Sequence, residues 1–186
     1  MLAPPKKPVD VLRSIAAPRE LIEWVRKMNP DEAVRRAWID VTRADWLPYI
    51  AILRGISKDS IVRATCTCVG ELAAPSLAQP PGDRIAAALD PQSLANAEQL
   101  LEDLRLQMLA FGDPPRWSEA SERWRAGTDP PPWIFWCKLV LELARAVRRG
   151  NSMIGVSLAL RMVATQGGRR GSSDLVARFR DELLMA

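Results

Sequence analysis

The sequence WIFWCKLVLELARAVRRGNSMIGVSLALRMVATQ at residues 133–166 decides the fold class of this chain. Gly150 divides it into two apolar segments, residues 133–149 and 152–166, and each has the length of a helix. Charged residues interrupt both segments, and each is shorter than the roughly 20 apolar residues that a membrane-spanning helix needs. The stretch therefore predicts two long core helices joined by a glycine turn, and no contact with a membrane.

Outward from this stretch, proline and glycine divide the rest of the sequence into helical segments, and nothing alternates with the period of two that a strand requires. Besides the two core helices, the longest predicted helices cover residues 18–27, 58–73, 91–111 and 173–185. The last one follows a basic loop at residues 167–171. The sequence thus predicts an all-α protein, either a multi-helix bundle or a compact helical array, with about eight to nine helices.

Helix-start and helix-stop signals fix several boundaries. Asn29-Pro30-Asp31-Glu32 predicts a capping box with Asn29 as the N-cap, and Asp90-Pro91 repeats the combination of cap and proline. Asp45 and Ser57 are the predicted N-caps of two further helices. Gly55 suits the left-handed position just past the end of the helix that Asp45 opens.

Length and proline-rich breaks set the domain organisation. A chain of 186 residues, 48% of them hydrophobic, can bury one substantial core. We expect a flexible N-terminal tail at residues 1–17, an N-terminal helical region at 18–112 and a C-terminal helical region at 113–186. The two helical regions are expected to form one continuous globular domain.

The sequence offers little chemistry. It contains no histidine, which removes Ser-His and Cys-His nucleophile pairs and the commonest general base. Cys66 and Cys68 are two residues apart, so on a helix they point about 200° away from each other and do not converge on one ion. A structural zinc site needs four ligands, and even with Cys137 the chain would supply only three. We therefore expect no metal, no cofactor and no enzymatic activity.

Cysteine usage and the N-terminal sequence bear on location. The odd number of cysteines lacks the spacing of a disulfide framework, and the N-terminus lacks the apolar stretch of a signal peptide. Both features favour free thiols and a cytoplasmic protein.

The net charge of +4 lies in the C-terminal part. Residues 113–186 hold 12 Lys and Arg against 8 Asp and Glu, whereas residues 1–112 hold 14 of each. Two tryptophans lie seven residues apart on one face of a predicted helix at 116–126. The predicted partner-binding residues are Arg148, Arg149, Arg169, Arg170, Arg178, Trp117 and Trp124.

Ala44-Asp45-Trp46-Leu47, followed by SIVRATCTCV at residues 60–69, resembles a group of small bacterial Ala/Trp-rich helical proteins described as immunity proteins. In that group a D-W-L-like turn precedes a helix of the form V-x-A-A-C-x-C-A, a proline-rich break and another helix. The resemblance covers about residues 31–100, and residues 113–186 match much less well. It implies an all-helical, non-enzymatic protein that binds a toxin or another protein, and it supplies no site residues.

The sequence favours two functions over an enzyme that would use a pair of carboxylates or a lysine. The first is a protein-interaction module, such as a toxin-neutralising immunity protein or a subunit of a bacterial assembly, whose arginines pair with carboxylates of the partner. The alternative is a nucleic-acid-binding accessory subunit, in which the C-terminal arginines neutralise phosphates. Flanking glycines would let Arg169 and Arg170 approach a backbone closely.

Overall fold

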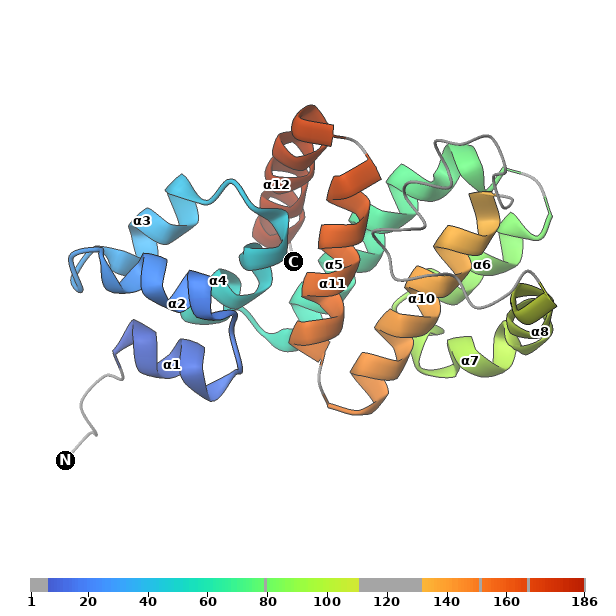
Figure 1. The fold of residues 1–186 in the computed structure, drawn as a ribbon, viewed down its shortest axis with the longest axis horizontal. Helices are drawn as coiled ribbons and strands as arrows, with labels where there is room; N and C mark the ends of the chain where they lie inside the picture. Colours follow the sequence, from blue (N-terminus) through green and yellow to red (C-terminus); the bar gives the residue numbers. More distant parts are fainter. Residues whose placement is uncertain (1–6, 79, 111–131, 151, 167, 186) are drawn as a thin grey trace.

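The computed structural model describes residues 7–78, 80–110, 132–150, 152–166 and 168–185, and every regular element in these ranges is helical (Figure 1). The α-helices are α1 (Pro8–Ser14), α2 (Arg19–Arg26), α3 (Ala33–Asp40), α4 (Leu47–Leu53), α5 (Lys58–Ala73), α6 (Gly82–Leu89), α7 (Ala97–Leu100), α8 (Glu102–Ala110), α10 (Pro132–Arg148), α11 (Ser152–Gln166) and α12 (Gly168–Met185). Three short 3-10 helices are η1 (Ala44–Trp46), η2 (Ala74–Ser76) and η3 (Leu94–Asn96). The predicted all-α class is confirmed, whereas the predicted helix number is too low. Among the described helices, none is long and apolar enough to cross a membrane.

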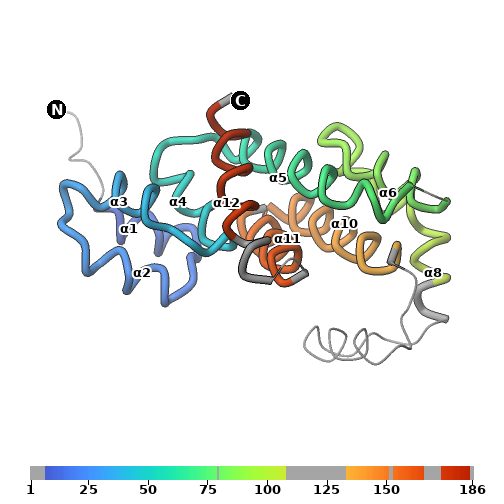
Figure 2. The backbone as a smooth tube through the Cα atoms, turned by 90° about the horizontal axis from the view of Figure 1, so that it is seen from above, coloured from blue at the N-terminus to red at the C-terminus, as the bar shows by residue number. Residues whose placement is uncertain are grey.

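The helices form an elongated arrangement with α11 near its middle. Helices α1 to α4 lie at one end and α6 to α8 at the other, with α5, α11 and α12 between them (Figures 1 and 2). Helix α11 packs against α10, α12, α5, α4 and η1. Buried apolar side chains from Leu12 to Leu183 belong to one core cluster, so segments from both halves of the sequence share the same interior.

Helices α10 and α11 are the two long core helices that the sequence predicts, and they pack against each other. Gly150 separates them in the left-handed conformation, with a φ of +74°. Their contact is unusually close at Gly155, because a Cβ atom added there would lie 2.2 Å from the Cβ of Ala146. The absence of a side chain at Gly155 therefore lets the two backbones approach each other.

The predicted ends of α4 and α5 are confirmed. The Ser57 hydroxyl oxygen accepts a hydrogen bond from the Ser60 amide at 3.1 Å, which caps α5. Gly55 follows α4 with a φ of +80°. The amides of Gly55 and Ile56 donate back to the carbonyls of Ile52 and Ala51 at 2.9 and 3.0 Å, which is a Schellman motif.

The two other cap predictions near the N-terminus are wrong. The side chain of Asn29 accepts from the Asp31 amide at 3.2 Å in a local turn, and α3 begins only at Ala33. The Asp45 carboxylate does not cap a helix, because Arg43 binds both of its oxygens at 3.1 and 2.6 Å. In both cases the side-chain oxygen has a different partner from the one that the local pattern suggested.

The predicted helix at residues 91–111 is broken into η3, α7 and α8. The Asp90 carboxylate accepts from the Gln92 amide at 2.9 Å and forms a turn instead of a long helix. The helical spacing of the sequence predicts an apolar stripe of Leu94, Ala97, Leu101, Leu104 and Met108, and the first four of these residues are nevertheless buried. The side chain of Met108 lies outside the described part of the structure. Each of the three segments packs against α10, so contact with α10 offsets the helical hydrogen bonds lost at the breaks.

Both expected flexible segments contain helix. Residues 8–14, placed in a mobile tail by the sequence, form α1, which begins with Pro8 and buries Leu12 completely. Helix α12 begins at Gly168, within the stretch predicted as a basic loop. A glycine inside a helix costs only about 1 kcal/mol, and the packing of α12 on α11 and α5 outweighs this cost. The predicted helix at 116–126 lies outside the described residues.

Candidate functional site

Of the predicted partner-binding arginines, the structure describes the side chains of Arg148, Arg149 and Arg178. Arg148 is paired with Glu98 of α7 at 2.5 Å, and Arg178 is paired with Glu71 of α5 at 3.1 Å. Arg149 is exposed and follows α10 directly. Two of the predicted partner-binding residues thus form ion pairs with other helices of the same chain.

Helix α11 lies between two sets of adjacent arginines in the chain. Arg148 and Arg149 precede its first residue, whereas Arg169 and Arg170 lie in the first turn of α12, beyond its last residue (Figure 1). Fifteen residues of helix rise by about 22 Å, so the pairs lie at opposite ends of α11. Trp117 and Trp124 lie outside the described residues.

Arg180 has a structural role that the sequence did not reveal. Its guanidinium group donates to the carbonyl oxygens of Trp38, Ile39 and Val41, at 3.1 Å for Ile39 and 3.2 Å for Val41. It also lies 5.8 Å from the centre of the Trp38 ring, and burial lowers its pKa from the ordinary value. Arg180 therefore ties α12 to the C-terminal end of α3.

The three cysteines are core residues. Cys66, Cys68 and Cys137 are free thiols buried in the interior, and this burial raises the pKa of each to about 12. Within the described ranges, no group of three or more Cys, Asp or Glu residues is placed to hold a metal ion.

We expect the native thiols to resist alkylation. At pH 8 a thiol with a pKa near 12 is almost wholly protonated, and only the thiolate reacts with iodoacetamide. Modification of the folded protein, followed by mass spectrometry, should be at least about 100-fold slower than that of the protein unfolded in guanidinium. Rapid labelling of any one cysteine in the folded chain would contradict its burial.

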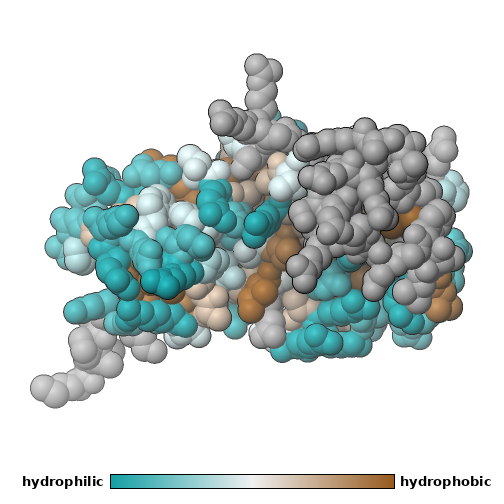
Figure 3. Space-filling view, viewed as in Figure 1, coloured by the Kyte–Doolittle hydropathy of each residue, from teal (hydrophilic) through white to brown (hydrophobic). Residues whose placement is uncertain are grey.

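One face of α11 reaches the surface. Ile154 is 49% exposed, Leu158 is partly buried and Arg161 is exposed. Their spacing of four and three residues puts them on one side of the helix. Figure 3 shows a hydrophobic strip down the middle of the molecule, where the N-terminal half of α11 runs in Figure 1. We call Ile154, Leu158 and Arg161 the α11 surface.

Two tryptophans, from α2 and η1, pack together, and η1 is hydrogen-bonded to α11. The rings of Trp24 and Trp46 lie 5.4 Å apart, and the Arg43 guanidinium lies 4.5 Å from the centre of the Trp46 ring. The same arginine pairs with the buried carboxylate of Asp45. The Ser157 hydroxyl of α11 donates to the Asp45 carbonyl oxygen at 2.7 Å. These contacts fix α11 relative to the N-terminal helices.

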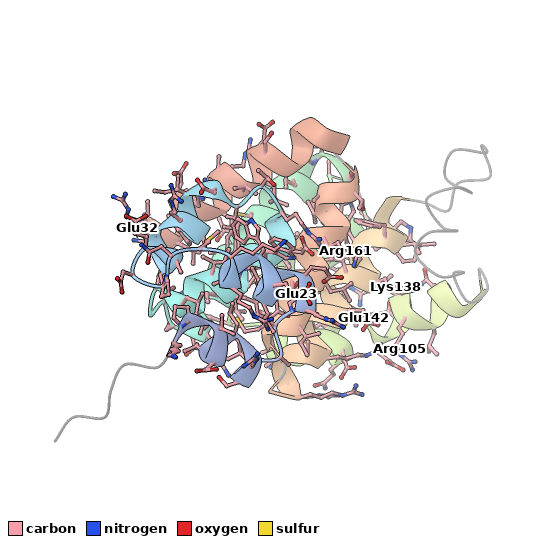
Figure 4. The ribbon with its side chains drawn as sticks, turned by 60° about the vertical axis from the view of Figure 1, so that its left-hand side comes forward. Glu23, Glu32, Arg105, Lys138, Glu142 and Arg161 are labelled. Atoms are coloured by element: carbon pink, nitrogen blue, oxygen red, sulfur yellow. The ribbon has the colours of Figure 1, made fainter. Side chains whose placement is uncertain are left out.

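Charged side chains also lie on α10, which packs against α11, and on α2. Figure 4 shows Arg161 of α11 with Lys138 and Glu142 of the adjacent helix α10, and Glu23 on α2. Glu142 is paired with Arg145 at 3.0 Å. Glu23 is paired with Arg19 at 2.8 Å, and this contact lowers the pKa of the Glu23 carboxyl. The arrangement is an apolar strip with a charged rim, which is the usual composition of a protein-binding surface.

Sequence reasoning assigned Ile154 and Leu158 to the core. Most of α11 is indeed buried, so the apolar residues on its exposed face look the same in the sequence as those on its buried faces. The available signal was Arg161, which interrupts the apolar segment and marks the exposed face. Residues four and seven positions before Arg161 share that face.

No protein-family model matches the chain, and neither a curated protein nor a solved structure matches it significantly.

Proposed function

We propose that this chain is a non-enzymatic helical protein that binds another protein through the α11 surface. The observation that carries the proposal is the exposure of Ile154, which shares one face of α11 with Leu158. Helix α11 itself is held in place by α10, α12, α5, α4 and η1. A fixed apolar strip within a charged rim favours association with a protein. The fit of residues 31–100 to the immunity-protein pattern agrees with a bacterial, cytoplasmic protein that neutralises a toxin or joins an assembly.

Protein binding is favoured over nucleic-acid binding by the ion pairs of the arginines. Arg148 and Arg178 already pair with Glu98 and Glu71, so they are less available to phosphates. An apolar strip, moreover, gains nothing from contact with a phosphate backbone. Nucleic acid is therefore an outcome of the test below and not a second proposal.

The test is affinity purification of the tagged chain from its native host, with mass spectrometry and a nuclease-treated duplicate. We expect a stoichiometric protein partner that survives nuclease. Ile154→Asp should reduce its recovery at least about tenfold, because the interface would have to desolvate a carboxylate. Asp is favourable in the first turn of α11, so the variant should remain folded, as circular dichroism can verify.

Leu184→Asp is the matched control. Leu184 is 69% exposed on α12, outside the α11 surface, so this variant should retain the partner fully. Loss of all co-purifying material after nuclease treatment would replace the proposal with nucleic-acid binding. Equal recovery with Ile154→Asp and Leu184→Asp would remove α11 as the binding surface.

A further inference from the structure

We propose that the partner presents an acidic amphipathic helix to the α11 surface. This inference rests on the proposed function and adds the chemistry of the segment that binds. It is carried by the distribution of paired and unpaired charges around Ile154 and Leu158.

Three carboxylates, on η1, α10 and α2, are already neutralised within the chain. Asp45 is paired with Arg43 at 2.6 Å, and Glu142 is paired with Arg145 at 3.0 Å. On α2, Glu23 is paired with Arg19. These three carboxylates therefore have little attraction left for a basic partner.

The charge left over at the strip is positive. Arg161 is exposed and makes no ion pair with any residue in the part of the chain that the structure describes. Arg149 follows α10, in the turn before α11, and it too is exposed and makes no ion pair with a described residue. In the sequence, Ile154 and Leu158 thus lie between two arginines, and each guanidinium group can bind a carboxylate in a bidentate way.

The length of the strip suits two turns of a helix. Ile154 and Arg161 are seven residues apart, which corresponds to about 10 Å along α11. A partner helix packed alongside would place apolar residues at positions i and i+3 or i+4 against Ile154 and Leu158. Acidic residues about one turn beyond each end would then reach Arg149 and Arg161. Helix-on-surface docking with such anchors is a common mode of peptide recognition.

The identity of the segment can be tested by photo-crosslinking in the native host. The photoreactive amino acid p-benzoylphenylalanine is incorporated at position 154 in one tagged chain and at position 184 in another. We expect a crosslink from position 154 only, to a peptide with net negative charge and apolar residues three or four positions apart. A crosslink to nucleic acid, to a basic segment, or from position 184 alone would overturn the inference. So would the absence of any crosslink while a partner still co-purifies.

A charge reversal tests the role of Arg161. Arg161→Glu should weaken binding of the co-purified partner roughly tenfold at low salt, because it places a like charge against the acidic helix. Arg63→Glu makes the same change at an exposed arginine on α5 that forms no ion pair with a described residue, and it should leave binding unchanged. Unaltered affinity in Arg161→Glu would overturn the inference and leave the proposed function intact. If the native chain itself captures no protein, the proposed function fails first.

Discussion

Replacing Gly155 with alanine is expected to lower the free energy of unfolding by about 3 kcal/mol, at the upper end of the usual range for overpacking. The new Cβ would lie 2.2 Å from the Cβ of Ala146 and 3.7 Å from the Cα of Leu143. Neither atom belongs to the mobile end of a side chain, so α10 and α11 would have to move apart. Urea unfolding, monitored by circular dichroism, measures the change.

Two variants test whether this cost comes from the contact itself. Gly70→Ala on α5 adds a Cβ at an ordinary distance of 3.6 Å from Leu89, so it should stabilise the protein by about 0.5–1 kcal/mol through helix propensity. Ala146→Gly, combined with Gly155→Ala, removes the clashing methyl group and should recover most of the loss. If the double variant were no more stable than Gly155→Ala, the close approach of the two helices would not be the cause.

Replacing Arg180 with alanine is expected to cost about 3 kcal/mol of stability, since hydrogen bonds to a charged group contribute about 1.5–3 kcal/mol. The change removes the donor to the carbonyls of Trp38, Ile39 and Val41 at the end of α3. It also removes a guanidinium from the Trp38 ring. The loss should appear as a lower urea midpoint with an unchanged m-value.

Arg178→Ala is the control for this prediction. Arg178 lies two residues earlier on α12 and makes a half-exposed ion pair with Glu71. Exposed pairs contribute about 0–1 kcal/mol, so this variant should be nearly neutral. Arg180→Lys should recover only part of the loss, because an ammonium group lacks the planar fork that reaches several carbonyls. Equal stability of the two alanine variants would show that Arg180 does not hold α12 to α3.

The best sequence predictions were those that depended on local interactions. The start of α5 was predicted because the Ser57 hydroxyl accepts a hydrogen bond from an amide only three residues away. The end of α4 was predicted because Gly55 adopts the left-handed conformation. The helices α10 and α11 were predicted because their apolar residues continue for several turns around Gly150. Each signal and its partner lie within a few residues of each other.

Predictions failed where the decisive partner was tertiary or was a competing local group. Asp45 looked like an N-cap, but its carboxylate binds Arg43 and its carbonyl accepts from Ser157, which follows 112 residues later. The helix expected at 91–111 breaks because each of its three segments packs separately against α10. The sequence showed which residues in that region would be buried, since the stripe repeats at helical spacing. It could not show the path of the backbone.

The candidate surface was only partly accessible to sequence reasoning. Arginines were correctly seen to concentrate in the C-terminal part, but their pairing with Glu98 and Glu71 depends on helices far away in the sequence. The exposure of Ile154 depends likewise on which side of α11 is left uncovered by its neighbours. Both properties belong to the packing of whole helices and not to any local pattern.

The central position of α11 has a consequence for the biosynthesis of the chain. Helices α4 and α5 and the turn η1 all pack against α11, so their shared core stays open until residues 152–166 have emerged from the ribosome. At 5–20 residues per second, roughly ten seconds separate the synthesis of Asp45 from that of Ser157, which binds it. During that interval the nascent chain exposes apolar helix faces and is a natural client for chaperones. A premature stop before α11 should therefore direct the product to degradation, although most of its helices have been made.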